Sequence, residues 1–352
     1  MSLYAKVRPA LFLLPPEIAH RAAICAVQRG LVPQYNKRKH ASLRTTVAGL
    51  TFANPVGLAP GFDKNAECYE GALRAGCGFV EIGTVTPLAQ PGNEQPRVFR
   101  LVEEEAIINR LGFNNEGAEA AVKRLQKRSG RGIIGGNVGK NKLSLDAVGD
   151  YVSAMRTLYP RVDYITANIS SPNTPGLRSL QAGDELRALV REMQKLREEL
   201  MKMGAPSRPI FVKIAPDCDG DLLEAIAQVA METCIDGLIV SNTTVTRDNI
   251  GASDYANETG GLSGKPLFEF STTILRAMYK LTGGAIPLIG VGGIASSHDA
   301  YRKIRAGASL VQLYTALVYQ GFGLIGEIND GLAAFLARDG FANIADAVGV
   351  DA

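Results

Sequence analysis

The chain has 352 residues, a hydrophobic fraction of 46%, a charged fraction of 21% and a formal net charge of +3. These values are typical of a globular protein with a large core, and the charge is too small to indicate nucleic-acid binding. The five scattered cysteines form no CxxC pair and suit a reducing compartment, while three distant histidines argue against a metal site. With no secretory signal and no long apolar run, we expect a cytoplasmic chain without a membrane-spanning helix.

The first 40 residues are predicted to form two short amphipathic helices. Apolar residues recur at three- and four-residue spacing over residues 3–14, although Pro9 weakens this helix. The two consecutive prolines at residues 15–16 end the first helix. A second helix is expected over Glu17–Arg29, and a basic cluster follows at residues 37–39. Such helices either lie in a membrane interface or form a cap packed on the main domain, and the residues alone favour the cap.

From Thr45 onward, eight short apolar runs alternate with helical stretches. The runs are Pro55–Ala59, Phe79–Gly83, Gly132–Asn137, Tyr164–Asn168, Ile210–Ile214, Gly237–Ser241, Pro287–Gly290 and Ser309–Tyr314. The helices expected between them include Glu116–Arg128, Asp184–Met203, Asp219–Thr233 and Ser297–Ala306. Because the runs are rich in leucine and β-branched residues, they resemble parallel strands covered on both faces. Eight strand–helix units predict an α/β fold of the (β/α)8 TIM-barrel type; a doubly wound open sheet is the alternative, but it does not require eight units.

Two insertions interrupt this alternation of strands and helices. Residues 85–115 contain the strand-like pieces Arg97–Leu101 and Ala106–Asn109. Residues 170–183 are rich in serine, proline and glycine and follow the fourth strand, where a long loop is typically an active-site lid or binding loop. Residues 324–352 are expected to form a closing helix and a tail, to which we assign no function.

Lysines, amides and hydroxyls gather where the predicted strands end, which is the functional face of a barrel. Asparagine amides suit a planar ligand with alternating N–H and C=O groups, and Gly292-Gly293 suits a phosphate because no Cβ blocks the backbone N–H groups. Taken singly, the glycines also fit a tight turn, and Asn137 or Asn168 also fits a loop contact. Lys213 within an apolar strand is harder to explain structurally, because burying a charge is costly. Together these residues predict a phosphorylated cofactor beside a polar planar ligand.

Five runs of residues at these positions resemble the dihydroorotate dehydrogenase family, over about Thr45 to about Gly323. The runs are GLAPGFDK at 57–64, EIGTVTP at 81–87, NRLGFNN at 109–115, NISSPNTPG at 168–176 and TGGLSG at 259–264. Several independent runs in the same order make a chance resemblance improbable.

The resemblance implies flavin mononucleotide (FMN) as the cofactor and assigns two sets of contacts. The cofactor-binding residues would be Ala59, Pro60, Gly61, Phe62, Asp63, Thr84, Asn137, Asn168, Lys213, Ser241, Gly264, Gly293, Tyr314 and Thr315. The substrate-binding residues would be Lys64, Asn109, Arg110, Leu111, Gly112, Phe113, Asn168, Asn173, Asn242 and Thr243. Ser241 stands where threonine is expected in close relatives, and it keeps the hydroxyl group.

By this resemblance, Ser171 indicates the quinone-using class of the family, because the soluble class has cysteine as catalytic base at this position. The resemblance then implies oxidation of (S)-dihydroorotate to orotate in de novo pyrimidine (UMP) biosynthesis, with Ser171 as base and ubiquinone or menaquinone as acceptor. Thr174 and Phe113 would shape a water path for the proton.

The same class implies a division of the chain and a location. Residues 1–40 would form the membrane-associating quinone entry, and residues 45–340 the catalytic barrel. The protein would be peripheral on the cytoplasmic face of the inner (cell) membrane, with no obligate protein partner. The alternatives are a soluble enzyme reducing fumarate or NAD, a non-flavin phosphate-binding barrel, and a membrane-surface binding module.

Overall fold

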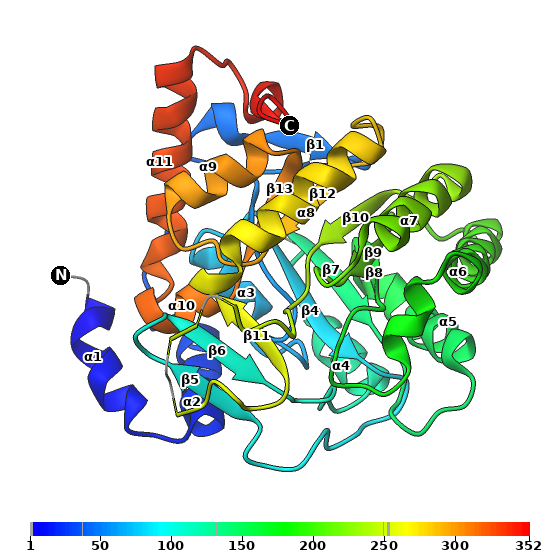
Figure 1. Cartoon of the computed structure of the whole chain (residues 1–352), viewed down its shortest axis with the longest axis horizontal. Helices are drawn as coiled ribbons and strands as arrows, with labels where there is room; N and C mark the ends of the chain where they lie inside the picture. The colour runs from blue at the N-terminus through cyan, green and yellow to red at the C-terminus, as the bar shows by residue number, and fades with distance from the viewer. Residues whose placement is uncertain (1–2, 37, 131, 249, 252–253) are drawn as a thin grey trace.

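The structure, a computed structural model, describes residues 3–36, 38–130, 132–248, 250–251 and 254–352. Its centre is a closed barrel of parallel strands in the order β10-β12-β13-β3-β4-β7-β8-β9 (Figure 1). The strands are β3 (Val56–Leu58), β4 (Phe79–Val85), β7 (Ile133–Val138), β8 (Tyr164–Asn168), β9 (Ile210–Ile214), β10 (Gly237–Val240), β12 (Leu288–Val291) and β13 (Ala308–Leu313). Each of the eight predicted apolar runs supplies one strand, so the predicted (β/α)8 barrel is confirmed.

Amphipathic helices cover the outside of the barrel and bury the outer faces of the strands (Figure 1). They are α3 (Tyr69–Arg74), α4 (Ala118–Leu125), α5 (Ala147–Leu158), α6 (Gly183–Lys202), α7 (Gly220–Thr233), α8 (Phe268–Leu281), α9 (Ser297–Arg305), α10 (Thr315–Gln320) and α11 (Gly323–Asp339). The closing helix expected near the C-terminus is α11, which packs on α9.

Aromatic side chains close the N-terminal end of the barrel. A short hairpin of β1 (Thr45–Val47) and β2 (Leu50–Phe52) places Phe52 against Phe79, with ring centroids 5.3 Å apart. Inside the barrel, Tyr164 lies edge-on to Phe211 at 5.2 Å. Because this end is filled by rings, a ligand can enter the barrel only at the C-terminal ends of the strands.

The insertions build a small second sheet over that open end. Strands β5 (Val98–Leu101) and β6 (Ala106–Asn109) pair antiparallel, as their sequence suggested. A third strand, β11 (Gly261–Gly264), joins β6 from a loop that follows β10, and its position was not predicted.

Helices α1 (Leu3–Phe12) and α2 (Pro16–Gln28) lie beside this small sheet (Figure 1). Helix α1 continues through Pro9, because tertiary contacts hold it: Tyr4 donates to the carbonyl of Val318 at 2.6 Å, and Phe12 packs edge-on against Tyr319 at 5.5 Å. Of the basic cluster at residues 37–39, residue 37 lies outside the described residues. Within the described ranges, no helix has both the length and the apolar character needed to cross a membrane.

Candidate active site

The open end of the barrel, the small sheet and the N-terminal helices enclose one cavity of about 880 Å³. The predicted cofactor residues that line it are Ala59, Pro60, Gly61, Phe62, Thr84, Asn168, Lys213, Ser241, Gly264, Gly293, Tyr314 and Thr315. The predicted substrate residues that line it are Lys64, Asn109, Leu111, Gly112, Phe113, Asn168, Asn173, Asn242 and Thr243, together with Ser171. Residues from all parts of the barrel sequence therefore meet in one place, although their individual roles stay predictions.

Three predicted site residues do not line this cavity. The Asp63 carboxylate is fully buried and accepts the N–H groups of Glu67 at 2.7 Å and Cys68 at 2.8 Å, so it shapes the loop after β3. Arg110 turns outward and forms an ion pair with Glu258 at 2.5 Å. Asn137 lies beneath the cavity and reaches it only through its hydrogen bond with Thr84. A contact from these three to a bound ligand stays a prediction.

A buried hydrogen-bond chain runs under the floor of the cavity. Asn137 donates its amide to Glu81 at 2.7 Å and accepts the hydroxyl of Thr84 at 2.5 Å; Thr84 in turn accepts the amide of Asn168 at 2.9 Å. Since a carboxylate only accepts, Glu81 fixes which end of the Asn137 amide faces upward. Gln312 also donates to Glu81, at 2.7 Å, which leaves its own amide oxygen buried without a partner among the described residues.

Two lysines give the cavity positive charge. Lys213, 5% exposed, has a pKa lowered by burial, and the nearby carboxyl group of Glu81 opposes that shift. Burial also lowers the pKa of Lys64 to about 8, while Glu17 acts to raise it and Arg97 to lower it. Both ammonium groups are suited to bind anionic parts of ligands.

Gly292 and Gly293 form the end of the cavity next to α8. Both have positive φ angles, 108° and 76°, and a Cβ on Gly293 would lie 2.5 Å from the backbone of Phe268. In the part of the chain that the structure describes, the N–H groups of these glycines have no protein acceptor. Free N–H groups in a glycine turn are suited to a phosphate, so this end fits the predicted phosphorylated cofactor.

Ser171 lies at the start of the loop after β8 and is 6% exposed. Its hydroxyl oxygen accepts the N–H of Asn173 at 3.2 Å, and neither a histidine nor a carboxylate among the described residues bonds to it. Thr174 is buried with its hydroxyl group unpartnered in the described structure. The arrangement offers a hydroxyl group beside the planar-ligand site but no neighbouring base to activate it.

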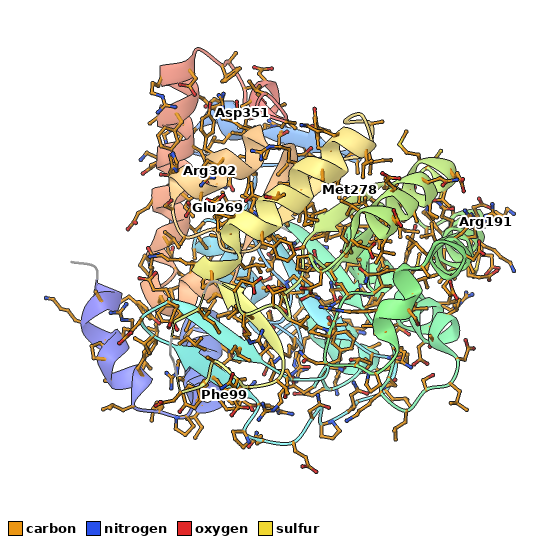
Figure 2. All side chains as sticks on the ribbon, viewed as in Figure 1. Phe99, Arg191, Glu269, Met278, Arg302 and Asp351 are labelled. Carbon is orange, nitrogen blue, oxygen red and sulfur yellow. The ribbon has the colours of Figure 1, made fainter. Side chains whose placement is uncertain are left out.

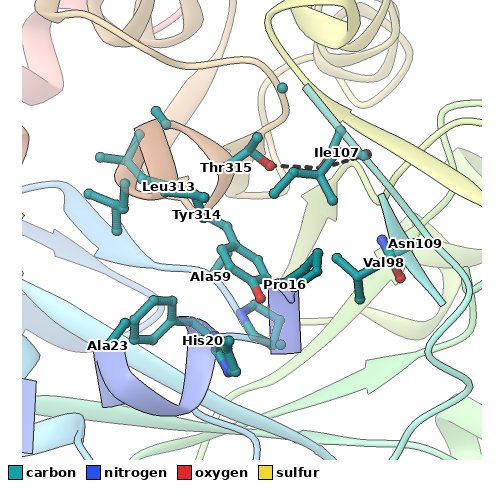
Figure 3. A pocket seen from close by; sticks show the side chains of 18 of the residues that line it. Pro16, His20, Ala23, Ala59, Val98, Ile107, Asn109, Leu313, Tyr314 and Thr315 are labelled. Atoms are coloured by element: carbon teal, nitrogen blue, oxygen red, sulfur yellow. Dashed lines mark hydrogen bonds between the residues drawn. The ribbon is translucent and has the colours of Figure 1, made fainter. Parts of the chain in front are cut away.

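An apolar arm of the cavity reaches between α1 and α2, and its polar residues were missed by the sequence reasoning. Figure 3 shows His20 and Pro16 of α2 beside Tyr314 at the end of β13. Burial lowers the pKa of His20 to about 3, with the charges of Lys64 and Arg21 acting in the same direction, so His20 is neutral near pH 7. Arg100 lines the same arm and stacks on Phe12 at 4.6 Å. Nothing in their spacing along the chain indicates that these residues meet.

Comparison with known proteins gives consistent matches. The family model described as dihydroorotate dehydrogenase matches residues 42–336. A "dihydroorotate dehydrogenase (quinone)" of Rhizobium etli is 54% identical over 332 residues, which cover 94% of this chain and 92% of that protein. One of Parvibaculum lavamentivorans is 52% identical and covers 100% of this chain and 99% of that protein.

Solved structures agree with these matches over nearly the whole length. The crystal structure of the Eimeria tenella DHODH in complex with ferulenol aligns with a TM-score of 0.93 at 40% identity, covering 98% of each chain. A ligand-free structure from the same organism aligns with a TM-score of 0.91 at 42% identity, covering 96% of this chain and 99% of the other.

Proposed function

The chain belongs to the dihydroorotate dehydrogenase family, and on that premise we propose that it oxidises dihydroorotate to orotate in pyrimidine biosynthesis, with FMN as bound cofactor and a quinone as electron acceptor. The observation that carries the proposal is that one cavity joins two environments. Its inner part is lined by amides, lysines and backbone N–H groups that have no acceptor in the described structure, and its outer arm by apolar side chains of α1 and α2 together with His20 and Arg100. Such a cavity gives a polar substrate and an apolar acceptor access to one cofactor.

For the cofactor, the residues present offer complementary groups at both ends. The phosphate would bind the free N–H groups of Gly292 and Gly293, and Lys213 would face the ring system from the barrel interior. FMN, when bound, would supply the redox chemistry that links hydride removal from the substrate to reduction of a quinone. A charged Lys213 stabilises negative charge that develops next to it without any rearrangement of the site.

For the substrate, Lys64 would bind the carboxylate and the asparagine amides would hold the pyrimidine ring. The rigid hydrogen-bond chain under Thr84 and Asn168 keeps these amides oriented, which favours aligned removal of the two hydrogens. Ser171 would take the proton from C5 as the hydride leaves C6. Because its hydroxyl group has no basic partner among the described residues, the proton would leave through solvent beside the loop of residues 170–183.

For the acceptor, the arm between α1 and α2 would admit ubiquinone or menaquinone. We assign residues 1–40 to this entry and residues 45–340 to the catalytic barrel. Several apolar side chains near the entry face solvent, including Leu13, 87% exposed, Ile18, 56% exposed, and Leu31, 74% exposed. A surface of this kind suits peripheral binding to the cytoplasmic face of the cell membrane, where the quinone is dissolved.

The first test is spectroscopic. The protein purified in mild detergent should show oxidised flavin absorption that bleaches with dihydroorotate without air and returns with a ubiquinone or menaquinone analogue. If the flavin absorption returns with fumarate or NAD instead, the proposed oxidation of dihydroorotate stands, but the proposed quinone acceptor is wrong. A colourless protein that cannot be reconstituted with FMN would defeat the proposal.

A matched pair of variants tests the apolar arm. Ala23 lines the arm, so Ala23→Phe should raise the KM for the quinone while bleaching by dihydroorotate stays at the wild-type rate. Ala10 is exposed on α1 and does not line the cavity, so Ala10→Phe should change neither. Equal effects of the two variants would remove the arm from the acceptor pathway.

A further inference from the structure

Lys303 is a fully buried lysine that the proposed chemistry does not use. It lies on α9 with no exposed surface, and its Nζ is 2.6 Å from the hydroxyl oxygen of Ser271 and 3.5 Å from the carbonyl oxygen of Val291. The ring of Phe268 lies 5.3 Å away. Among the described residues it has no carboxylate within ion-pair distance. An unpaired buried ammonium group is costly, so a lysine at this position either loses its proton or is stabilised by a nearby anion.

Ser271 connects this lysine to the glycine turn at the end of the cavity. Its hydroxyl group accepts from Lys303 and lies 3.1 Å from the carbonyl oxygens of both Phe268 and Gly292, its two alternative acceptors. Contact is close here, since a Cβ on Gly292 would lie 2.7 Å from the Ser271 oxygen. Ser271 on α8 thus holds the carbonyl group of Gly292, and Lys303 on α9 holds Ser271. The carbonyl oxygen of Val291 accepts the N–H of Ser241 at 3.2 Å, with Lys303 as a second, more distant donor.

Because the peptide bond is planar, the direction of a carbonyl group in this turn also fixes the direction of the N–H group that follows it. In a trans peptide the C=O of one residue is antiparallel to the N–H of the next. When the carbonyl group of Gly292 points at Ser271, the N–H group of Gly293 points the other way. The N–H group of Gly292 is directed in the same manner by the Val291 carbonyl group, whose nearer donor is Ser241. Those two N–H groups are the ones without a protein acceptor in the described structure, and both glycines line the cavity.

Resting on the proposed function, we propose that Lys303, acting through Ser271, is a positioning residue for the cofactor phosphate. Through Ser271 it fixes the direction of the Gly293 N–H group, and in its protonated form it places a positive charge behind the glycine turn. Its contribution is therefore specific to the phosphate and independent of the flavin ring.

The charged groups near Lys303 shift its pKa, but among the described residues none of them forms an ion pair with it. Burial lowers its pKa well below the usual value; Glu269 and Asp299 oppose that shift, and Arg302 adds to it. Glu269 is itself paired with Arg302 at 2.8 Å on the outer surface, where Figure 2 labels both. A phosphate bound beyond the glycine turn adds negative charge and so favours the charged form of Lys303.

The test compares FMN with riboflavin, which has the same ring system and no phosphate. Holoproteins carrying either flavin are diluted, and the rise in flavin fluorescence on release gives the dissociation constant. Lys303→Met should weaken FMN binding by about tenfold or more, the scale of one charge-assisted contact, and leave riboflavin binding unchanged. Ser271→Ala should show the same selective loss, and the double variant should be no weaker than Lys303→Met alone.

Lys280→Met is the matched control, because Lys280 is an exposed lysine in the last turn of α8, at the other end of the helix from Phe268, which contacts Gly293; it should change neither constant. Equal weakening of FMN and riboflavin by Lys303→Met would indicate a purely structural role and overturn the inference, as would unchanged FMN binding. If Lys303→Met does not fold, Ser271→Ala decides by the same criterion. A wild-type protein that binds neither flavin would instead defeat the proposed function.

Discussion

The ion pair between Glu17 and Arg97 should hold α2 against the barrel, and replacing Arg97 by methionine tests this. Arg97 donates to both carboxylate oxygens of Glu17 at 2.9 Å and to the carbonyl groups of Pro91 and Asn93 at 2.7 Å each. Its side chain is 9% exposed and that of Glu17 is 31% exposed. Since Glu17 is on α2 and Arg97 precedes β5, any opening of α2 away from the barrel must break this pair.

The expected magnitude follows from this burial. Removing one partner of a buried ion pair costs about 3–5 kcal/mol, because the other charge is left unpaired. Glu17 is about a third exposed and regains water when α2 opens, so we reduce the figure to about 2–3 kcal/mol. At about 1.4 kcal/mol per factor of ten, the opening equilibrium of α2 should rise roughly 30- to 150-fold.

Hydrogen exchange resolved by peptide is the assay, because it reports local opening separately from global unfolding. In Arg97→Met, amides of residues 16–28 and of the loop at 90–97 should exchange faster by that factor, while those of β8 and β9 keep the wild-type rate. Arg21 on the same helix makes a single contact with Glu67 at 2.8 Å and is 59% exposed. Arg21→Met is therefore the control, with less than about a fivefold effect. Unchanged exchange in α2, or equal acceleration in β8, would refute the reasoning.

Three further predictions concern the reaction and the membrane. Ser171→Ala should retain its flavin but slow bleaching by dihydroorotate by about 10²- to 10⁴-fold in stopped-flow absorbance, and full-rate bleaching would remove Ser171 from the mechanism. Lys64 binds a carboxylate only when protonated and its pKa is about 8, so orotate affinity by calorimetry should fall as pH rises through about 8; this pH dependence should vanish in Lys64→Met and persist in Lys280→Met. Leu13→Asp should weaken flotation with lipid vesicles by about tenfold or more, whereas Leu143→Asp, at a residue 90% exposed on a barrel loop, should not; equal losses would argue against an N-terminal membrane contact.

Local patterns predicted the barrel because each strand carries its signal in consecutive residues. A stretch such as Ile210–Ile214 is buried on both faces, so its apolar run is visible without knowledge of its neighbours. Lys213 stood out for the same reason, because a lysine in such a run has no structural explanation. The strand-end positions follow from these assignments, and the cavity indeed collects most of the residues expected at them.

Contacts across long sequence distances were not predictable in this way. Strand β11 pairs with β6 more than 150 residues away in sequence (Gly261 opposite Asn109), and its four residues carry no apolar alternation of their own. The same limit explains Pro9, whose local effect on α1 is overridden by contacts with residues near the C-terminus.

The strands, the order in which polar residues follow them, and the family could therefore be predicted, because these depend on residues close together in the chain. Which amide ends face the cavity could not be predicted, because Glu81 meets Asn137 and Gln312 across the barrel interior. The same holds for the ion pair between Glu17 and Arg97, which attaches α2 to the barrel. It holds also for Lys303, which lies behind the glycine turn rather than on the surface of an otherwise polar helix. These positions depend on barrel closure and helix packing, for which no local pattern carries a signal.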